Sequence, residues 1–202
     1  MTRTSIASHL NALFLLALTA LAAFAPSPAA ADPLPQAGHV LMLRHAYAPG
    51  IGDPPGFRLD DCASQRNLDA SGRAQAAAVG DWLRAQGVRQ ARVHSSQWCR
   101  CQETARLLGL GAVTPTPALN SFFGEPQARD GTLQALRAFL AQQPADGPLL
   151  VLVTHQVNIA AVTGRGIGSG EGVLLAREPG GELRVVRTLD FGATSGGGRA
   201  RG

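Results

Sequence analysis

The sequence predicts an α/β fold with three layers, in which helices flank a mostly parallel central sheet. Three short apolar runs, at 39–44, 91–94 and 148–154, are typical of buried strands, and stretches with helical spacing of apolar residues alternate with them. Strands that alternate with helices form parallel sheets covered on both faces. The 202 residues are 45% hydrophobic, which predicts one domain with a substantial core.

Each remaining element follows from local signals. Asp69 or Ser71 is the expected N-cap of the first helix, and Gly87 is expected to end it. Ser95 and Ser96 are expected to cap the second helix. The other expected elements are that second helix through 104–108, an extended segment over 113–119 broken by two prolines, helices over 132–142 and 157–163, and strands over 172–177 and 183–189 that form a hairpin at the sheet edge.

The N-terminus has the pattern of a secretory signal peptide. Arg3 is followed by an apolar stretch over about 10–25, and Ala29 and Ala31 fit the small-residue cleavage rule. We expect a signal peptide over 1–31, a single domain over 32–190 and a disordered tail over 191–202. The apolar stretch is short for a membrane span, so we expect a periplasmic or secreted protein with no stable membrane insertion after cleavage. An uncleaved anchor is the alternative.

The charge pattern argues against a nucleic-acid partner. All 18 basic residues are arginine, the net charge is only +4, and no cluster of arginines is visible. One Tyr and two Trp provide little surface on which bases could stack. An arginine that lies at the right place has a different use, because its planar fork matches two phosphate oxygens at once.

Three cysteines follow the predicted signal peptide, at 62, 99 and 101. An exported chain folds where disulfides form. Cys99 and Cys101 are too close in sequence to bridge comfortably at a helix start. We therefore expect Cys62 to pair with one of them, with Cys101 as the candidate partner, and three buried thiols as the alternative. No metal-binding spacing is present, so no metal site is expected.

Histidines follow two of the core strands directly. The strands end in Arg44-His45, His94-Ser95 and Thr154-His155, and carboxyl ends of parallel strands share the edge of the sheet where ligands bind. A neutral imidazole can attack phosphorus, and fixed guanidinium cations stabilise the transferring phosphoryl group. The pattern predicts a phosphate-ester site in which one histidine is the nucleophile and arginines hold the oxygens.

Four ordered segments carry a resemblance to a known family. They are Leu43-Arg44-His45; Arg66-Asn67-Leu68 with Gly72 and Gln75; Ser96-Gln97-Trp98-Cys99-Arg100-Cys101 with Thr104-Ala105; and Val153-Thr154-His155 with Asn158-Ile159. Over about 39–187 the chain resembles the histidine phosphatase superfamily, in its phosphoglycerate mutase-like branch 1. The resemblance implies that fold, His45 as the phosphorylated nucleophile, and Arg44, Arg100 and His155 as holders of the phosphoryl oxygens. It implies no cofactor and no metal.

The chain departs from the family pattern at three positions. Ala46 replaces the usual Gly after the first histidine, and Ala48 replaces a hydroxyl residue. Asn120 stands where many members have the glutamate that serves as general acid. We take Glu125 as the nearest substitute acid, with Asp130 or Asp53 as alternatives. Some compact members manage without a clear acid when the leaving group is good.

Other polar residues near these motifs have structural explanations. Arg66 either belongs to the site as part of its family-like segment or is only an ion-pair partner in its loop. His94 is expected to be a bystander, and His39 a surface residue. The favoured function is a phosphomonoester hydrolase that acts through phosphohistidine on a small phosphorylated substrate, with sugar phosphates and phosphorylated lipopolysaccharide core sugars as candidates. The alternatives are a phosphate-binding pseudoenzyme and a metal-dependent hydrolase.

Overall fold

A computed structural model of the chain describes residues 33–144, 146–178 and 181–192. The predicted signal peptide and most of the predicted tail lie outside the described residues, so both stay predictions. Within the described ranges, no helix has the length and apolar character needed to cross a bilayer.

The core of the fold is one six-stranded sheet with the strand order β3-β2-β4-β1-β5-β6. The first four strands in this order run parallel, and the last two add an antiparallel hairpin at the edge. The predicted three-layer α/β fold and its terminal hairpin are confirmed. The strands are β1 His39–Arg44, β2 Arg92–Ser95, β3 Val113–Pro115, β4 Leu150–Thr154, β5 Gly172–Arg177 and β6 Leu183–Leu189.

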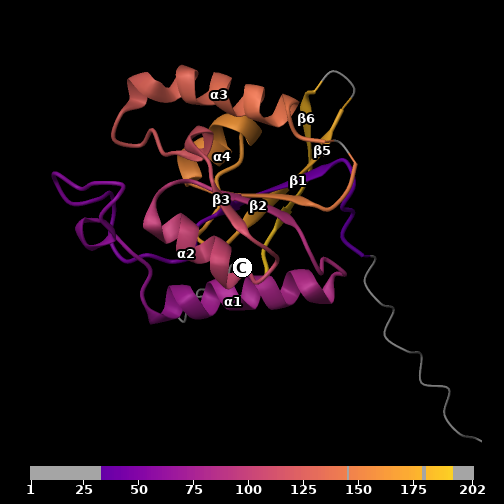
Figure 1. Cartoon of the computed structure of the whole chain (residues 1–202), viewed down its shortest axis with the longest axis horizontal. Helices are drawn as coiled ribbons and strands as arrows, with labels where there is room; N and C mark the ends of the chain where they lie inside the picture. The colour runs from indigo at the N-terminus through magenta and orange to yellow at the C-terminus, as the bar shows by residue number, and fades with distance from the viewer. Residues whose placement is uncertain (1–32, 145, 179–180, 193–202) are drawn as a thin grey trace, which may run out of the picture. The chain divides into compact units, whose positions relative to one another are not determined.

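Helices cover both faces of the sheet (Figure 1). One face is covered by α1 and α2, and the other by α3 and α4. Side chains of β1 alternate between the two layers: Leu41 and Leu43 belong to one core cluster, and Val40 and Met42 to the other. The helices are α1 Ala70–Ala85, α2 Cys99–Leu107, α3 Arg129–Ala141 and α4 Gln156–Thr163, with short 3-10 turns at Cys62–Ser64, Pro117–Leu119 and Pro126–Ala128.

The two predicted helix caps have different outcomes. Asp69 caps α1 by accepting a hydrogen bond from the N–H of Gly72 at 2.8 Å, as the sequence predicts. The predicted serine cap of α2 is wrong, because this helix begins later and its N-cap is Trp98, which makes no side-chain cap bond. Ser95 donates to the carbonyl of Ser96, and the hydroxyl of Ser96 is used in the site described below.

A glycine permits the close packing of α1 against the end of α2. Gly80 is buried in α1, and a Cβ placed there would overlap the backbone of Leu108. We expect Gly80→Ala to lower the free energy of unfolding by about 1–3 kcal/mol, because two backbones must separate. Urea denaturation measures this effect.

A matched control for this variant is Gly131→Ala in α3. A Cβ at Gly131 meets nothing within 4 Å, and the residue lies in the first turn of the helix. Alanine is favoured over glycine in a helix interior by about 0.5–1 kcal/mol, so at this position the variant is expected to be at least as stable as the parent. Equal effects of the two substitutions would contradict the close-approach argument.

Candidate active site

The carboxyl ends of three parallel strands bring the predicted site residues together. Arg44 pairs with Thr154 across β1 and β4, and Ser95 on β2 pairs with Val153 on β4. The residues that follow each strand therefore emerge at one edge of the sheet. The ring centroids of His45 and His155 lie 5.5 Å apart, so the two histidines face the same small space.

His45 is a buried imidazole whose proton position is set by the backbone. Its Nδ1 lies 2.8 Å from the carbonyl oxygen of Ala46, which can only accept, so Nδ1 carries the hydrogen. In the neutral ring Nε2 then holds a lone pair, and this atom has no partner in the described part of the chain. Burial lowers the pKa of His45 to about 3, and the charge of Arg100 adds to the effect. The ring is therefore neutral and nucleophilic at physiological pH.

The two predicted phosphate-binding arginines each leave one buried donor unused. Among the described residues, Nε of Arg44 and Nε of Arg100 are buried without a hydrogen-bond partner. Nη1 of Arg44 donates to the carbonyl of Ile167 at 2.9 Å, which fixes the guanidinium in place. An unsatisfied buried donor costs about 1–3 kcal/mol. Two of them beside His45 are suited to an anion with several acceptor oxygens.

A carboxylate that the sequence left ambiguous orients Arg100. Asp53 accepts from Nη1 and Nη2 of Arg100 at 2.7 and 3.1 Å, from the indole N–H of Trp98 at 3.0 Å, and from the N–H of Arg66 at 3.0 Å. Burial alone would raise the pKa of Asp53, but these hydrogen bonds, first from Arg100, outweigh it and lower the pKa. Both oxygens are fully engaged, so Asp53 holds Arg100 and is unsuited to donate a proton.

His155 lies between α2 and the end of β4. Its Nε2 is 2.9 Å from the hydroxyl of Ser96 and 3.4 Å from the thiol of Cys101. The ring of Trp98 packs edge-on against it at a centroid distance of 5.2 Å. Burial holds the pKa of His155 well below its usual value. Coupling to the titration of His45 and the charge of Arg100 act in the same direction.

Arg66 secures the loop that follows His45. Its Nη1 donates to the carbonyl of Ala48 at 2.5 Å and its Nε to the carbonyl of Gly52 at 2.7 Å. Its charge acts on the pKa of both His45 and His155, which places it near the cluster. The structure therefore gives Arg66 a role in holding the loop beside the site, through hydrogen bonds to backbone carbonyls and not through the ion pair that the sequence suggested.

No predicted acid is brought to His45 by a contact in the described residues. Glu125 is exposed and precedes a 3-10 turn without making a cap bond, and Asp130 is exposed and pairs with Arg129. Asn120 does lie at the site, where its Oδ1 accepts from Ser96 and from the N–H of Gln97. This amide organises its neighbours and has no proton to transfer.

The histidines expected outside the site are placed as predicted. His94 contacts the ring of Phe139 at a centroid distance of 4.8 Å, and its Nδ1 lies 2.9 Å from the hydroxyl of Thr116, both outside the cluster. His39 is at the start of β1, the opposite end from Arg44. Ala46 replaces the usual glycine without leaving an unused amide, because its N–H donates to Thr104 at 3.0 Å.

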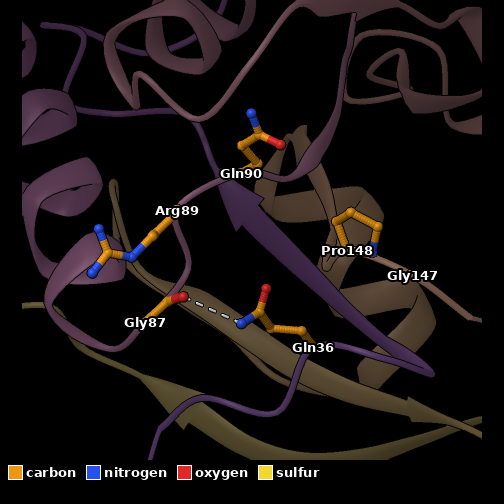
Figure 2. Close-up of a pocket in the computed structure, with 6 residues that line it drawn as sticks. All are labelled: Gln36, Gly87, Arg89, Gln90, Gly147 and Pro148. Atoms are coloured by element: carbon orange, nitrogen blue, oxygen red, sulfur yellow. Dashed lines mark hydrogen bonds between the residues drawn. The ribbon is translucent and has the colours of Figure 1, made fainter.

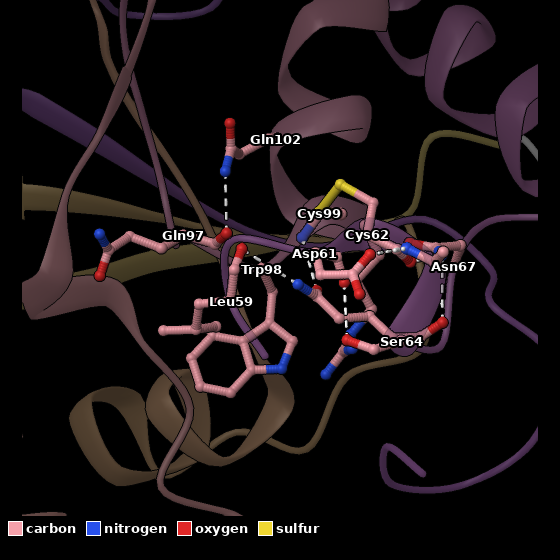
Figure 3. The surroundings of a disulfide bond; sticks show 12 residues. Leu59, Asp61, Cys62, Ser64, Asn67, Gln97, Trp98, Cys99 and Gln102 are labelled. Carbon is pink, nitrogen blue, oxygen red and sulfur yellow. Dashed lines mark hydrogen bonds between the residues drawn. A yellow bond between two sulfur atoms is a disulfide. The ribbon is translucent and has the colours of Figure 1, made fainter. Parts of the chain in front are cut away.

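The disulfide joins Cys62 to Cys99, which corrects the predicted pairing with Cys101 (Figure 3). Cys99 and Cys101 are two residues apart on α2, so their side chains point to different sides of the helix. Cys99 faces the loop that carries Cys62, and Cys101 is a free thiol buried against His155. Burial raises the pKa of the Cys101 thiol to about 12.

Reduction of this disulfide is expected to loosen the site. The bond spans a sequence separation of 37 and closes the loop that contains Arg66, and its second cysteine directly precedes Arg100, the partner of Asp53. Chain-entropy arguments give a loop of this length about 4 kcal/mol of stabilisation. We expect the double variant Cys62→Ser/Cys99→Ser, or the reduced protein, to melt at a lower temperature and to bind oxyanions more weakly.

Two observations check this prediction. Mass spectrometry of the oxidised protein without reductant should find one disulfide and one thiol, and Cys101→Ala should retain the reductant sensitivity of the parent. Three free thiols in oxidised material, or reductant sensitivity that depends on Cys101, would contradict the assignment.

A separate hollow of about 610 Å³ lies elsewhere on the protein (Figure 2). It is lined by residues that precede β1, β2 and β4, among them Gln36, Arg89 and Pro148, so it lies at the amino edge of the parallel strands. Its only charged lining residue is Arg89. It is therefore distinct from the cluster around His45, which contains the candidate nucleophile and the two arginines.

Sequence reasoning missed three residues that shape the site. It did not predict that Ser96 contacts His155 or that the ring of Trp98 packs against His155. Nor did it predict that the carbonyl of Glu171 accepts from the N–H of Arg44. Oε2 of Glu171 accepts from the N–H of Gly168 at 2.7 Å, and its charge acts on Arg44. The sequence shows the motif around Ser96, but the partners of Ser96, Asn120 and His155, are distant in sequence, so these contacts could not be predicted from it.

The fold and the sequence comparisons agree on the class of protein. The architecture is the α/β fold of phosphoglycerate mutase-like proteins. Residues 63–125 match the sequence model of the histidine phosphatase superfamily (branch 1). The resemblance that the four motifs predicted is thereby confirmed: the chain is similar to the histidine phosphatase superfamily, branch 1. The comparison with curated proteins gives no match.

Solved structures of phosphatases share this fold. The protein histidine phosphatase SixA complexed with tungstate has a TM-score of 0.54 at 16% identity, and the match covers 76% of this chain and 97% of that one. A putative alpha-ribazole-5'-P phosphatase from Escherichia coli has a TM-score of 0.60 at 17% identity, covering 77% and 98%. A mycobacterial glucosyl-3-phosphoglycerate phosphatase has a TM-score of 0.53 at 20% identity, covering 74% and 97%.

Proposed function

We propose that the protein is a phosphatase that hydrolyses phosphomonoesters through a phosphohistidine formed on His45. The observation that carries the proposal is the unpaired Nε2 of a neutral, buried His45 beside two guanidiniums, each with an unused Nε–H. The similarity to the histidine phosphatase superfamily supports it.

The reaction has two steps: the phosphoryl group is transferred first to His45 and then to water. In the first, the lone pair on Nε2 of His45 forms a P–N bond as the P–O bond to the leaving group breaks, and the leaving oxygen takes a proton from the solvent. In the second, a water attacks phosphorus and releases a proton to the solvent, the P–N bond breaks with its electron pair returning to Nε2, and inorganic phosphate leaves. Arg44 and Arg100 stabilise the charge on the equatorial oxygens in both steps. The proposed mechanism uses no metal.

The missing carboxylic acid restricts the substrates in this proposal. Asn120 occupies the expected acid position and its amide is engaged with Ser96 and Gln97, while Glu125 is exposed. A leaving group that needs little protonation is therefore favoured. Phosphate esters of acidic alcohols and phosphoramidates meet this requirement, and small phosphorylated sugars remain candidates where the leaving group is activated. An exported, periplasmic or secreted location is part of the same proposal.

The test compares two esters of different leaving-group acidity in the presence of EDTA. We expect the kcat/KM for p-nitrophenyl phosphate to be at least about a hundredfold higher than for an unactivated alkyl phosphate, the size of effect that general acid catalysis supplies, because kcat/KM reports the step in which the leaving group departs. A rapid quench in alkali should trap an acid-labile phosphate on His45.

The outcomes separate the alternatives. Equal rates on both esters would show that an acid operates and would contradict the substrate restriction. Oxyanion binding without turnover of either ester would favour the phosphate-binding pseudoenzyme, which the engaged Asn120 makes the main rival. Loss of activity in EDTA would favour the metal-dependent hydrolase.

A further inference from the structure

We propose that the contact between Ser96 and Asn120 fixes His155 with its hydrogen on Nε2, so that the site takes up one proton when a fully ionised oxyanion binds. The inference rests on the proposed function, because it places the phosphoryl group between His45 and His155. It concerns a different question, namely which protonation state of the substrate the site accepts.

The orientation of the Asn120 amide follows from its backbone partner. The N–H of Gln97 lies 2.9 Å from Oδ1 of Asn120 and can only donate, so this atom must be the carbonyl oxygen. The NH₂ group then donates to Oε1 of Gln97 at 2.8 Å. Since Oδ1 only accepts, the hydroxyl of Ser96, at 3.2 Å, must direct its single hydrogen toward Asn120.

Both neighbours of His155 Nε2 therefore present lone pairs to it. The hydroxyl of Ser96 has used its hydrogen, so at 2.9 Å it accepts from the ring. The thiol of Cys101, at 3.4 Å, has the carbonyl of Thr154 as an acceptor for its own hydrogen at 3.7 Å. The neutral ring consequently carries its hydrogen on Nε2. Nδ1 keeps a lone pair and has no partner in the described residues.

A lone pair on Nδ1 conflicts with an ionised phosphoryl oxygen, which also has only lone pairs. Either the oxygen brings a hydrogen, as in the monoanion of a phosphate ester, or Nδ1 takes a proton from solvent. Before an anion binds, the second choice is opposed first by burial, which keeps the pKa of His155 low. The groups that face the ring act in the same direction: His45 and Arg44 at the end of β1, Arg66 in the following loop, and Arg100 in α2.

A bound dianion reverses this balance. Its charge neutralises the guanidiniums and attracts the imidazolium, so the pKa of His155 rises on binding. The neighbouring thiol does not compete for the titration, since burial raises the pKa of Cys101 to about 12. Affinity for a permanent dianion should then fall as the pH rises, by about tenfold per pH unit for one coupled proton.

The direct experiment is nitrogen-15 NMR of the histidine rings in the intact, oxidised protein, with assignments made by single His→Gln variants. Without ligand at pH 7.5 we expect His155 as the Nε2–H form and His45 as the Nδ1–H form. With sulfate, which keeps its double charge across the neutral range, we expect both nitrogens of His155 to be protonated. A free His155 in the Nδ1–H form, or a neutral ring in the sulfate complex, would overturn the proposal.

The second measurement is the pH dependence of sulfate affinity between pH 7 and 9. We expect the dissociation constant of the parent protein to rise at least about tenfold over this range, with a limiting slope of about tenfold per unit for one proton. In Asn120→Ala, Ser96 can turn its hydrogen to His155, which frees the Nδ1–H form, and the rise should shrink to a few-fold. Gln97→Ala leaves the Oδ1 contact with Ser96 and serves as the matched control, with the steep dependence retained.

The results distinguish this inference from the proposed function. Sulfate or tungstate that binds with no pH dependence, in a protein that still hydrolyses p-nitrophenyl phosphate, would overturn the proton uptake and leave the phosphatase proposal standing. Failure of every oxyanion to bind, together with no turnover, would overturn both.

Discussion

His45→Ala is expected to lower kcat for p-nitrophenyl phosphate by about ten-thousandfold or more, with the fold retained. The variant removes the unpaired Nε2 of His45, the proposed nucleophile, and loss of a nucleophile has effects of this size in other enzymes. The surrounding structure should persist because the β1 ladder and the helices do not depend on this ring. Steady-state kinetics and circular dichroism measure the two parts.

The control for this variant is His39→Ala at the opposite end of the same strand. The one hydrogen bond of its ring among the described residues is with the carbonyl of Ala37, far from the site, so kcat should be unchanged. The phosphate label trapped in alkali should be present in His39→Ala and missing from His45→Ala. A His45→Ala protein that keeps half of the parent activity would end the assignment of the nucleophile.

Asp53→Ala is expected to have the largest effect on stability. It leaves Arg100 buried with its partner removed, since the side chains of Arg100 and Asp53 are only 4% and 8% exposed. Breaking a buried ion pair on one side costs about 3–5 kcal/mol, which for a domain of this size lowers the melting temperature by roughly 6–20 °C. Activity should fall as well, because among the described residues only the carboxylate of Asp53 accepts hydrogen bonds from both Nη1 and Nη2 of Arg100 and so fixes its guanidinium.

A double variant distinguishes loss of the pair from loss of packing. Asp53→Ala/Arg100→Met replaces the stranded cation with an apolar chain of similar length, and it should recover most of the stability but none of the activity. Added sulfate should stabilise Asp53→Ala more than the double variant, because only the former keeps the guanidinium. Equal melting temperatures for the single and double variants would contradict the buried-pair argument.

The sequence predicted the parts of this protein that depend on local pattern. The β1 run is apolar at every interior position and ends in Arg44-His45, and the observed strand has the same bounds. The shared edge of the sheet followed from parallel pairing, and the contact of His45 with His155 agrees with that expectation. The hairpin of β5 and β6 was signalled by its proline–glycine turn and has the predicted bounds.

What the sequence could not predict depends on which distant groups meet. Asp53 was one of several candidate acids, and only the folded loop shows that both its oxygens are bound by Arg100 and Trp98. The choice of Cys99 over Cys101 depends on the rotation of α2, which spacing alone does not determine. Asn120 differs from the family pattern as a single residue, and its link to Ser96 requires tertiary contact.

The disulfide between Cys62 and Cys99 also affects when, after synthesis, the protein can bind an anion tightly. A chain newly made in a thiol-rich compartment would lack this crosslink, while the buried pair of Asp53 and Arg100 could still form. If the protein is exported, as we propose, its affinity for oxyanions should therefore increase when the bond forms. The same chain kept reduced would be the weaker binder.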